Sequence, residues 1–332
     1  MMNIETTITG NTPIAITIGN FDGIHRGHQY LFQILREVAQ ETDSAPTLVT
    51  FTPHTLQIVR PEVNLECLTT LDEKLALAKQ YGHLNNYIII HFTPQVAAMS
   101  AREFLDELRT RFTIRAIVVG NNFSLGHKRM GNIAFLQQYG EEHGIVVRAI
   151  ELAEDGPEHI SSTRIRNLVR EGNVAEAGKL LGHPVVVSGV VIRGDQRGRL
   201  IGFPTANLLP PSHKLIPANG VYAARVHIGK AAKSDAANNT DVSIDEAPTY
   251  WPAGEKPLAS AVNIGVRPTF DGQKRLIEAH LLDTNLDLYD QFISIDFIAR
   301  LRSEQRFNGI DALKTQIASD VQQARQILQE GG

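Results

Sequence analysis

The sequence has almost no cysteine, no long apolar run and no block of basic residues. Its 332 residues include a single cysteine, Cys67, so an intramolecular disulfide framework is excluded. No apolar run approaches the length that spans a bilayer, and the first eight residues lack the basic and apolar regions of a secretion signal. We therefore expect a soluble cytoplasmic protein that does not act at a membrane.

Charge is also close to balanced. The 32 lysines and arginines stand against 36 acidic residues, which gives a net charge of −4. Without a basic block, the chain is not expected to bind nucleic acid over an extended surface, although a local phosphate pocket is compatible with this balance. We expect small molecules as partners, and at most a weak homo-oligomer. The length is sufficient for two domains, each with its own core.

A strand, a turn and a helix are predicted between residues 14 and 38. Isoleucines alternate with smaller residues over 14–18, which is typical of a half-buried strand. Glycine, asparagine and aspartate interrupt this pattern over 19–23, and apolar residues then recur at helical spacing over 31–38. The stretch therefore predicts one strand-helix unit, around which the first half of the chain is organised.

Two histidines mark the start of that helix. His25 and His28 stand three apart, so their rings share one face beside backbone N–H groups that lack intrahelical partners. These groups and the helix dipole favour anions, the imidazoles can donate to phosphate oxygens, and Gly27 removes a Cβ that would block close approach. The pair therefore predicts a phosphate site in which the histidines stabilise a leaving pyrophosphate and need not act as nucleophiles.

Two other interpretations of the histidine pair stay open at this point. Histidines three apart on a helix also occur by chance. A metal site would need further ligands at a recognisable spacing, and the other histidines and Cys67 are scattered along the chain.

A regular alternation of strands and helices continues to residue 150. The short apolar runs are residues 48–51, 87–92, 116–119 and 145–150. Thr70-x-x-Glu73 and Ser100-x-x-Glu103 have the reciprocal N-cap pattern that starts a helix. This alternation predicts a mostly parallel sheet covered by helices on both faces. Ligands of such sheets bind beyond the carboxyl ends of the strands, so informative residues should follow strands.

Polar turns do follow two of these strands. Phe51-Thr-Pro-His54 comes after the second, where a proline turn with a surface histidine is an equally good interpretation. Residues 119–126 follow the fourth, and their two glycines and two asparagines, including Asn122, suit a tight loop around a ligand.

A second phosphate pattern occurs over residues 160–166. Ser161, Ser162 and Thr163 supply hydroxyls and amides at a helix start, while Arg164 or Arg166 one turn later can neutralise a phosphate. An ordinary N-cap followed by solvated arginines would have the same pattern.

The alternation of strands and helices stops near His183, and a different domain is predicted beyond it. A helical pair over 168–181 ends at Gly182-His-Pro184, so we place the domains at 1–182 and 183–332. Strands separated by turns then predict a small antiparallel barrel at residues 185–192, 220–228, 259–264, 277–282 and 292–301. A closing helix is expected to pack on the barrel through Ile310, Leu313, Ile317, Val321, Ala324 and Leu328.

Two loops of this second domain differ in character. Residues 193–207 contain Gly194, Gly198 and Gly202, which permit a mobile cover over phosphates. Thr205 and Asn207, two apart in an extended chain, can present oxygen ligands to Mg²⁺, although a flexible hairpin loop would also be rich in glycine. Residues 229–257 are polar and small, and we expect a mobile extension there.

The first domain resembles a known family of nucleotide-binding enzymes. The string from Gly19 to His28, Gly-Asn-Phe-Asp-Gly-Ile-His-Arg-Gly-His, is similar to the signature of the HxGH nucleotidylyltransferases, and most closely to that of bacterial FAD synthetase. Residues 160–166 resemble the family's ISSTxxR motif, with Arg166 as its arginine. Two such motifs at separate strand-helix junctions argue against coincidence.

This resemblance implies a Rossmann-like fold and roles for individual residues. It implies His25, His28 and Asn122 as catalytic residues. It implies that ATP and its phosphates are bound by Gly19, Asn20, Phe21, Asp22, Gly27, Ser161, Ser162, Thr163 and Arg166. Thr52 and Leu125 depart from the family pattern, which has an acid and an aromatic residue at these positions.

The second domain resembles riboflavin kinase. Its Gly-Phe-Pro-Thr-Ala-Asn string at residues 202–207 is similar to a motif of that family. Further segments resemble successive family segments in the same order, at residues 217–222, 263–270, 278–283, 287–289 and 301–307. Asp290 stands where the family's Leu-Tyr-Gly turn has glycine.

The riboflavin kinase resemblance also implies a site. Glu278 would be the general base that takes the proton from the terminal hydroxyl of the riboflavin ribityl chain, although a glutamate in an edge strand is usually a solvated residue. ATP and its phosphates would be bound by Gly194, Gly198, Gly202, Thr205 and Asn207. The flavin would be bound by Asn263, Arg267 and Arg302.

Together the resemblances cover residues 12–328 and imply a bifunctional enzyme. The second domain would make FMN from riboflavin and ATP, and the first would adenylylate FMN to FAD with release of pyrophosphate, both steps using ATP and Mg²⁺. One alternative keeps the kinase but gives the first domain another acceptor, as the Thr52 and Leu125 departures suggest. Another is a flavin-binding regulator without turnover, against which Thr205, Asn207 and Glu278 argue.

Overall fold

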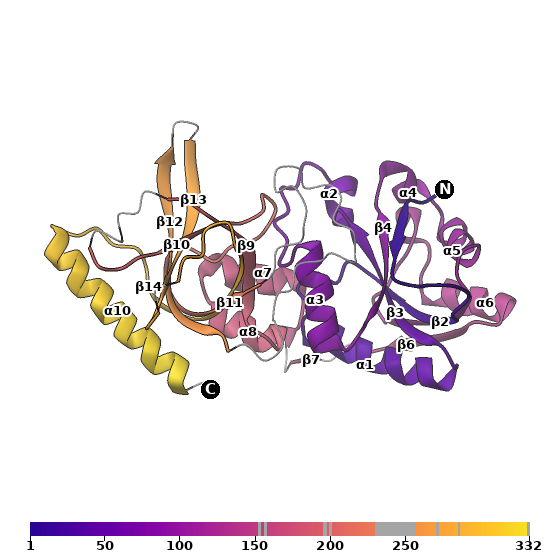
Figure 1. The fold of residues 1–332 in the computed structure, drawn as a ribbon. Helices are drawn as coiled ribbons and strands as arrows, with labels where there is room; N and C mark the ends of the chain where they lie inside the picture. The colour runs from indigo at the N-terminus through magenta and orange to yellow at the C-terminus, as the bar shows by residue number, and fades with distance from the viewer. Residues whose placement is uncertain are drawn as a thin grey trace. The chain divides into compact units, whose positions relative to one another are not determined.

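The structure, a computed structural model, describes residues 1–151, 154–155, 158–194, 198, 201–229, 256–269, 272–284 and 286–330. These residues form two units, each with its own core. Residues 1–67 and 74–161 belong to the first unit, and residues 68–73 and those from 162 onward to the second. Figure 1 shows a sheet with helices in the first unit and a barrel in the second. The chain therefore contributes one short early segment, 68–73, to the later unit.

The first unit contains a six-stranded sheet with the order β1-β4-β3-β2-β5-β6. Its strands are β1 (Ile4–Thr6), β2 (Ile14–Ile18), β3 (Ala45–Thr52), β4 (Asn86–His91), β5 (Ile114–Gly120) and β6 (Val146–Ile150). All neighbouring pairs are parallel except β1 with β4. The predicted mostly parallel sheet is confirmed. The sequence did not signal β1, because three residues are too few to display a strand period.

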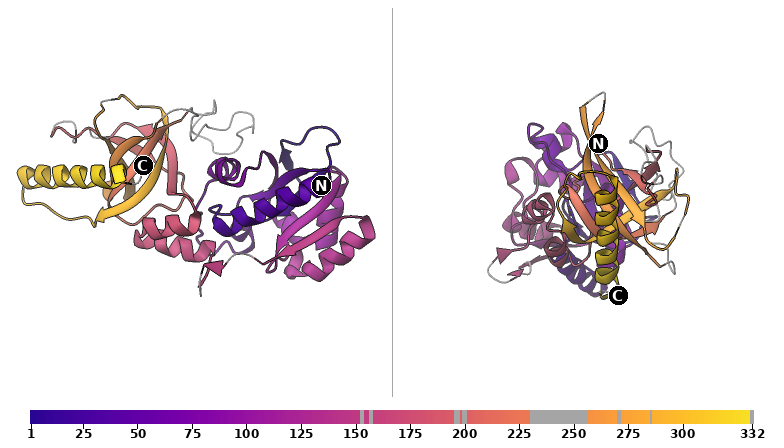
Figure 2. Two further views of the ribbon diagram at one scale, coloured as in Figure 1. Left: turned by 90° about the horizontal axis from the view of Figure 1, so that it is seen from below. Right: turned by 90° about the vertical axis from the view of Figure 1, so that its left-hand side faces the viewer.

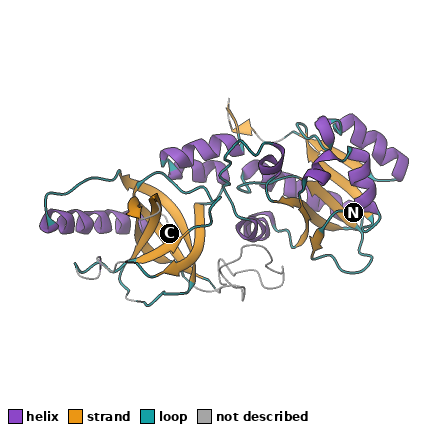
Figure 3. Cartoon of the chain, turned by 90° about the horizontal axis from the view of Figure 1, so that it is seen from above, coloured by secondary structure: helices purple, strands orange, loops and turns teal. Residues whose placement is uncertain are grey.

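Helices cover both faces of this sheet (Figures 2 and 3). They are α1 (Arg26–Glu41), α2 (Thr55–Val59), α3 (Leu71–Gly82), α4 (Pro94–Ala98), α5 (Ala101–Arg109) and α6 (Ile133–His143), with a 3-10 turn over His127–Arg129. Ile14, Ile16 and Ile18 of β2 share one core with side chains of α5 and α6, whereas α1 packs along β2, β3 and β5. The alternating side chains of β2 thus pack against helices on both faces of the sheet, because successive strand residues face opposite sides.

Both predicted N-caps are present. Thr70 Oγ1 accepts from the Glu73 backbone N–H at 3.2 Å, and the Glu73 carboxylate accepts from the Thr70 N–H at 3.0 Å. Ser100 and Glu103 make the same reciprocal pair at 3.2 and 2.7 Å. Each pair satisfies two amides that would otherwise lack partners at a helix start.

The second unit is a closed barrel with strand order β10-β13-β12-β11-β14-β9, and all its paired strands are antiparallel. The strands are β9 (Val185–Ile192), β10 (Ala206–Leu209), β11 (Gly220–Ile228), β12 (Leu258–Thr269), β13 (Gly272–Leu281) and β14 (Phe292–Arg302). The predicted antiparallel barrel is confirmed. The sequence missed β10, whose four residues include Asn207 and carry no strand signal, although this strand closes the barrel between β9 and β13.

Two helices precede the barrel within the second unit. They are α7 (Ser162–Glu171) and α8 (Val174–Leu181), and α8 packs against β9 and β14. Gly172 joins the two helices with a φ of +79°, a backbone conformation that favours glycine. A Cβ there would also lie 2.7 Å from the Tyr222 hydroxyl, so both the backbone conformation and the available space require glycine. A left-handed Gly182 ends α8 where the sequence predicted it.

The closing helix α10 (Ile310–Glu330) packs on the barrel through its second half. Val321, Ala324 and Leu328 share a core with Ala223, Ala261 and Leu282 of the barrel unit. The prediction that Ile310 belongs to this packed stripe is wrong, because its side chain is 61% exposed. The helix begins at Ile310, and its first turns extend beyond the strands that cover the later residues.

Some predicted features fall outside the part described. The expected mobile extension at 229–257 lies outside the described residues except for its ends, and the side chain of Arg267 is not described either. Between β6 and α7, β7 (Glu154–Asp155) and β8 (Glu158–His159) pair as a short antiparallel ribbon. Among the helices of the described chain, none combines the length and apolar character that a membrane crossing requires.

Candidate active sites

The turn between β2 and α1 has an unusual backbone. Phe21, Gly23 and Ile24 all have positive φ, at 49°, 89° and 43°. Such angles are costly for a β-branched residue such as Ile24, and strain of this kind gathers at functional sites. A Cβ on Gly19 would lie 3.0 Å from the buried Phe21 ring, so the glycine makes room for that ring. The turn holds a conformation that the local sequence does not favour, which points to a function.

The two signature histidines stack at the start of α1. His25 is the N-cap, and its Nδ1 accepts from the His28 backbone N–H at 3.4 Å. The two rings lie 3.6 Å apart and nearly parallel, at 19°. A Cβ on Gly27 would sit 3.3 Å from the His25 ring, so the immediate neighbour of this glycine is the histidine. The stacked pair presents two imidazoles beside the N–H groups of the helix start, as an anion site requires.

The surroundings of His28 favour the uncharged form of its imidazole. Burial, the neighbouring His25 and Lys74, in that order, hold the pKa of its imidazole well below the usual range. Its Nδ1 atom is buried and has no hydrogen-bond partner in the part of the chain that the structure describes. Since buried polar atoms are nearly always paired, this nitrogen indicates a position for a ligand or water.

Asn20 ties the signature turn to the polar turn after β3. Its side chain donates to the Thr55 hydroxyl at 2.8 Å and accepts from the Thr55 N–H at 3.1 Å. Its carbonyl accepts from Thr50 Oγ1 at 3.3 Å, and that hydroxyl in turn accepts from the buried Lys74 at 3.1 Å. Asp22, also buried, interacts electrostatically with Lys74. Sequence reasoning missed Lys74, because nothing local distinguishes one lysine inside a helix.

The other predicted residues of the first half occupy different settings. Asn122 is exposed in the turn after β5, which neighbours β2 in the sheet. Its loop and the signature turn thus follow adjacent strands, where the strand order reverses direction, as expected for a ligand site. His54 caps α2 through its Nδ1 and the Leu56 N–H at 3.2 Å. Leu125 is 8% exposed and belongs to the core.

The second phosphate motif begins α7. Ser161 directly precedes the helix, Ser162 is its first residue, and Thr163 is exposed in the first turn. Arg166, one turn later, is only 8% exposed. Hydroxyls and amides therefore gather at this helix start, while one arginine is held inside the fold and not on a solvated face.

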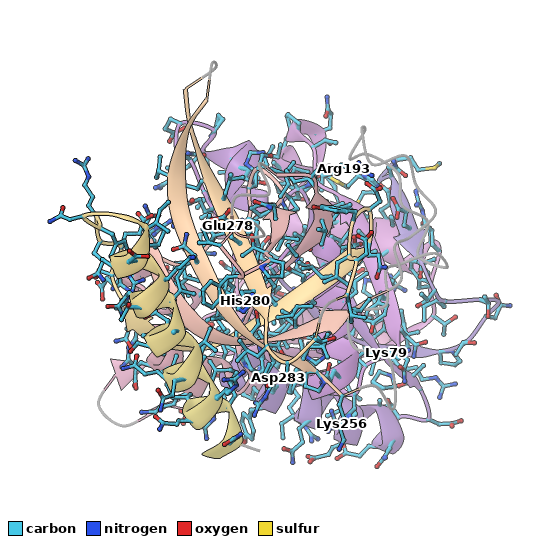
Figure 4. The ribbon with its side chains drawn as sticks, turned by 60° about the vertical axis from the view of Figure 1, so that its left-hand side comes forward. Lys79, Arg193, Lys256, Glu278, His280 and Asp283 are labelled. Carbon is cyan, nitrogen blue, oxygen red and sulfur yellow. The ribbon has the colours of Figure 1, made fainter. Side chains whose placement is uncertain are left out.

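In the barrel, three predicted site residues form one row across adjacent strands. Glu278 of β13 stands directly opposite Asn207 of β10 on one side and Asn263 of β12 on the other. Directly opposed residues of antiparallel strands place their side chains on the same face. The next residues along these strands are fully buried and form the apolar layer of the other face, at Leu208, Ile277 and Ile264. Figure 4 shows Glu278 and His280 along the same strand.

The glycine-containing loop lies on this row. A Cβ on Gly194 would sit 2.4 Å from Asn207 Nδ2, so a larger residue there would displace the Asn207 side chain. A Cβ on Gly198 would sit 2.3 Å from the Phe203 carbonyl, and the Gly198 carbonyl accepts from the Phe203 N–H at 2.8 Å. His280 fixes the following residue, because its Nδ1 lies 2.8 Å from the Pro204 carbonyl oxygen. Gly194 and Pro204 thus lie against Asn207 of β10 and His280 of β13.

The predicted flavin-binding residues have contrasting partners. Asn263 is a member of the row. The Arg302 guanidinium is bidentate to Asp320 of α10, at 2.9 and 2.8 Å, and lies 5.7 Å from the Phe307 ring centre. Asp320 is 2% exposed, so this ion pair holds the helix against the barrel. Arg302 thus has a structural task, whatever further contact it makes.

These arrangements indicate the class of protein to which the chain belongs. A Rossmann-like sheet with an anion site at its switch point is typical of nucleotide-binding enzymes. A row of one carboxylate and two amides beside a glycine loop has the kinds of group that phosphoryl transfer uses, a base and oxygen ligands. Together these features are typical of an enzyme with two nucleotide-dependent sites.

Comparison with known proteins agrees with this class. The FAD synthetase family model matches residues 8–164, and the riboflavin kinase family model matches residues 181–328. The bifunctional riboflavin kinase/FMN adenylyltransferase of Escherichia coli (strain K12) is 36% identical over 94% of this chain and 91% of its own. That of Pseudomonas fluorescens is 35% identical over 93% and 91%. A crystal structure of a Streptococcus pneumoniae protein described as a macrolide-efflux protein superposes with a TM-score of 0.80, at 28% identity over 96% and 95%.

The chain belongs to the family of bifunctional riboflavin kinases/FMN adenylyltransferases. The predicted family is confirmed. An FAD synthetase domain is followed by a riboflavin kinase domain, and the enzyme carries both activities of FAD biosynthesis, with ATP and flavins as substrates.

Proposed function

We propose that the two sites act in sequence through the residues assembled above. In the barrel, Glu278 takes the proton from the ribityl hydroxyl of riboflavin as that oxygen attacks the γ-phosphorus of ATP, giving FMN and ADP. The observation that carries this assignment is the row of Asn207, Glu278 and Asn263 beside the glycine loop. Phosphoryl transfer asks the protein mainly for positioning, charge neutralisation and one base. Arg267 and Arg302 would complete the flavin site with Asn263.

The barrel residues fit a magnesium ion. Asn207 Oδ1 is buried and lacks a hydrogen-bond partner among the described residues, although native buried oxygens are nearly always paired. Amide and hydroxyl oxygens are hard ligands of the type that Mg²⁺ accepts. Thr205 and Asn207 would hold the ion, which would neutralise phosphate charge, while Gly194, Gly198 and Gly202 let the loop backbone approach the phosphates.

For the FAD synthetase reaction, we propose that the FMN phosphate attacks the α-phosphorus of ATP in line and that pyrophosphate leaves. His25, His28, Ser161, Ser162, Thr163 and Arg166 would stabilise the departing charge. Gly19, Asn20, Phe21, Asp22 and Gly27 would shape the turn that receives ATP, and Asn122 would act from the neighbouring loop. The stacked imidazoles and the unpaired His28 Nδ1 support this role. No covalent intermediate with the enzyme is needed.

Organisation and location complete the proposal. We propose functional domains at 1–182 and 183–332; the family matches leave residues 165–180 between them. Since both reactions use small soluble substrates, we place the enzyme in the cytoplasm, with at most weak self-association.

A single time course tests the proposed order. The purified protein is incubated with riboflavin, ATP and Mg²⁺, and the flavins are separated over time. FMN appearing first and then converting to FAD is the expected result. Accumulation of FMN without FAD would confine the chemistry to the barrel and favour the alternative in which the first domain uses another acceptor.

A further inference from the structure

A buried lysine lies behind the signature turn of the first unit. Lys74 of α3 is only 5% exposed, and its ammonium donates to Thr50 Oγ1 at 3.1 Å. Thr50 is fully buried near the carboxyl end of β3, and its hydroxyl donates to the Asn20 carbonyl at 3.3 Å. One hydroxyl therefore connects the lysine to the backbone of the strained turn.

The charge of Lys74 is costly in this position. Burial lowers the pKa of its ammonium, and Asp22 and then Cys67 act against that shift. Lysine is rarely buried unless it is paired, and neighbours on the same helix, Leu77 and Ala78, fill the core with apolar side chains. An apolar residue would pack here at lower cost, so the ammonium indicates an electrostatic task.

The charged and titratable groups around His28 define that task. His25 stacks on its ring from the turn, and Lys74 acts on it from α3. Asp22 and Cys67 act in turn on Lys74. Phe21 and Phe32 supply the remaining ring contacts, at 5.1 and 6.5 Å, and carry no charge. Lys74 is therefore the lysine that sets the environment of His28 from outside the signature.

We propose that Lys74 is a positioning residue for adenylyl transfer, which holds the signature turn through Thr50 and sets the electrostatic environment of His28. This inference rests on the proposed role of His28. A neutral imidazole can donate one hydrogen bond to a phosphate oxygen while its second nitrogen accepts another. Burial and the neighbouring His25 disfavour a second proton on the ring most, and Lys74 adds to them from outside the signature.

The test uses the full-length protein with Lys74→Met, Lys74→Arg and Thr50→Val. Lys74→Met should lower kcat for FAD formation from FMN, ATP and Mg²⁺ by about 10- to 100-fold, since small misplacements cost that much. Riboflavin kinase activity of the same chain should be unchanged, which reports on folding. Lys79→Met is the matched control, because Lys79 is exposed on the same helix and its loss should change neither activity.

The pH profile separates positioning from simple packing. Removing a nearby positive charge makes His28 easier to protonate. The acidic limb of the kcat/KM profile should therefore move to higher pH in Lys74→Met. In Lys74→Arg, which keeps the charge, the limb should stay at its wild-type pH. Thr50→Val keeps the charge, so it should lower kcat without moving the limb. A wild-type kcat with an unmoved limb in Lys74→Met would overturn the proposal.

The experiment stays decisive if Lys74→Met does not fold or if the proposed role of His28 is wrong. If Lys74→Met does not fold, Thr50→Val and Lys74→Arg test the proposal in its place. A wild-type kcat in Thr50→Val would then overturn it. If His28→Ala retains full adenylylation, the proposed role of His28 fails; if His28→Ala loses it while Lys74→Met does not, only the role of Lys74 fails.

Discussion

At the scale of residues, the proposed barrel site centres on a carboxylate that stands between two amides. Glu278 gains this setting from the register of three strands, which no neighbour in sequence provides. A carboxylate in such a row can accept a proton while Asn207 and Asn263 orient the groups around it. A substitution can therefore remove the chemistry of this carboxylate without lowering the stability of the barrel.

Replacing Glu278 by Gln keeps the shape of the side chain and removes the base. FMN formation should fall by about 10²- to 10⁴-fold, the usual contribution of a general base. FAD formation from supplied FMN should be unchanged, and both rates are measured by separating the flavins. Asp283→Asn is the matched control, because this exposed acid pairs with Arg325 at the surface. An unaffected rate of FMN formation would remove Glu278 from the mechanism.

Asp290 occupies a backbone position that favours glycine. Its φ is +62°, in the left-handed region, and it stands where the family pattern has glycine. Asp290→Gly should therefore stabilise the protein by about 0.5–1 kcal/mol, because glycine adopts this conformation without steric cost. Asp290→Ala should destabilise it by about 1 kcal/mol. Thermal unfolding checks both, and equal Tm values for the two variants would contradict this reasoning.

At the scale of elements, the beginning of α3 is part of the barrel unit. Residues 68–73 group with that unit, although the helix continues into the other one. Glu73 is fully buried and accepts from the Lys214 ammonium at 2.7 Å and from the Ser188 N–H at 3.0 Å. Lys214 also donates to the Leu68 carbonyl. The same carboxylate thus caps the start of its own helix and binds Ser188 and Lys214 of the barrel unit.

This buried ion pair should respond differently to single and double substitution. Glu73→Ala leaves the Lys214 ammonium buried without its carboxylate, so the free energy of unfolding should fall by about 3–5 kcal/mol. Glu73→Leu combined with Lys214→Met removes both charges and should recover most of that loss. Denaturant unfolding measures both variants. A double variant as unstable as Glu73→Ala would show that the pair itself, and not the unpaired charge, is what matters.

At the scale of the whole molecule, one chain carries two activities, and the residues proposed to be central to them, Glu278 and His28, lie in different units. Glu278 belongs to the barrel unit, and His28 belongs to the sheet unit. FMN is the product of one reaction and a substrate of the other. Because FMN is a small soluble molecule, it can leave one chain and enter another.

Two inactivated chains should therefore complement each other. His28→Ala should convert riboflavin only to FMN, with adenylylation reduced by about 10²- to 10³-fold. Glu278→Gln should make FAD only from supplied FMN. Mixed in equal amounts, the two variants should produce FAD from riboflavin, as separation of the flavins would reveal. A mixture that makes FMN but no FAD would mean that FMN must pass within a single chain.

The fold was largely predictable where the chain repeats a strong local pattern. Strand β2 and helix α1 follow from hydrophobic periodicity, and the caps at Thr70 and Ser100 follow from short motifs. Strands β1 and β10 were missed because three or four residues cannot display a period. Ile310 was misplaced because periodicity identifies an apolar face but does not say how much of it another element covers.

The sequence by itself determined the family and both activities, because the residues proposed to contact phosphates cluster in short strings at strand ends and helix starts. Only the tertiary structure decided which distant residues share a site. Strand register aligns Asn207, Glu278 and Asn263, and the packing of α3 brings Lys74 to Thr50. These contacts join positions far apart in the chain, and their free energy depends on burial and on neighbouring charges that no local pattern records.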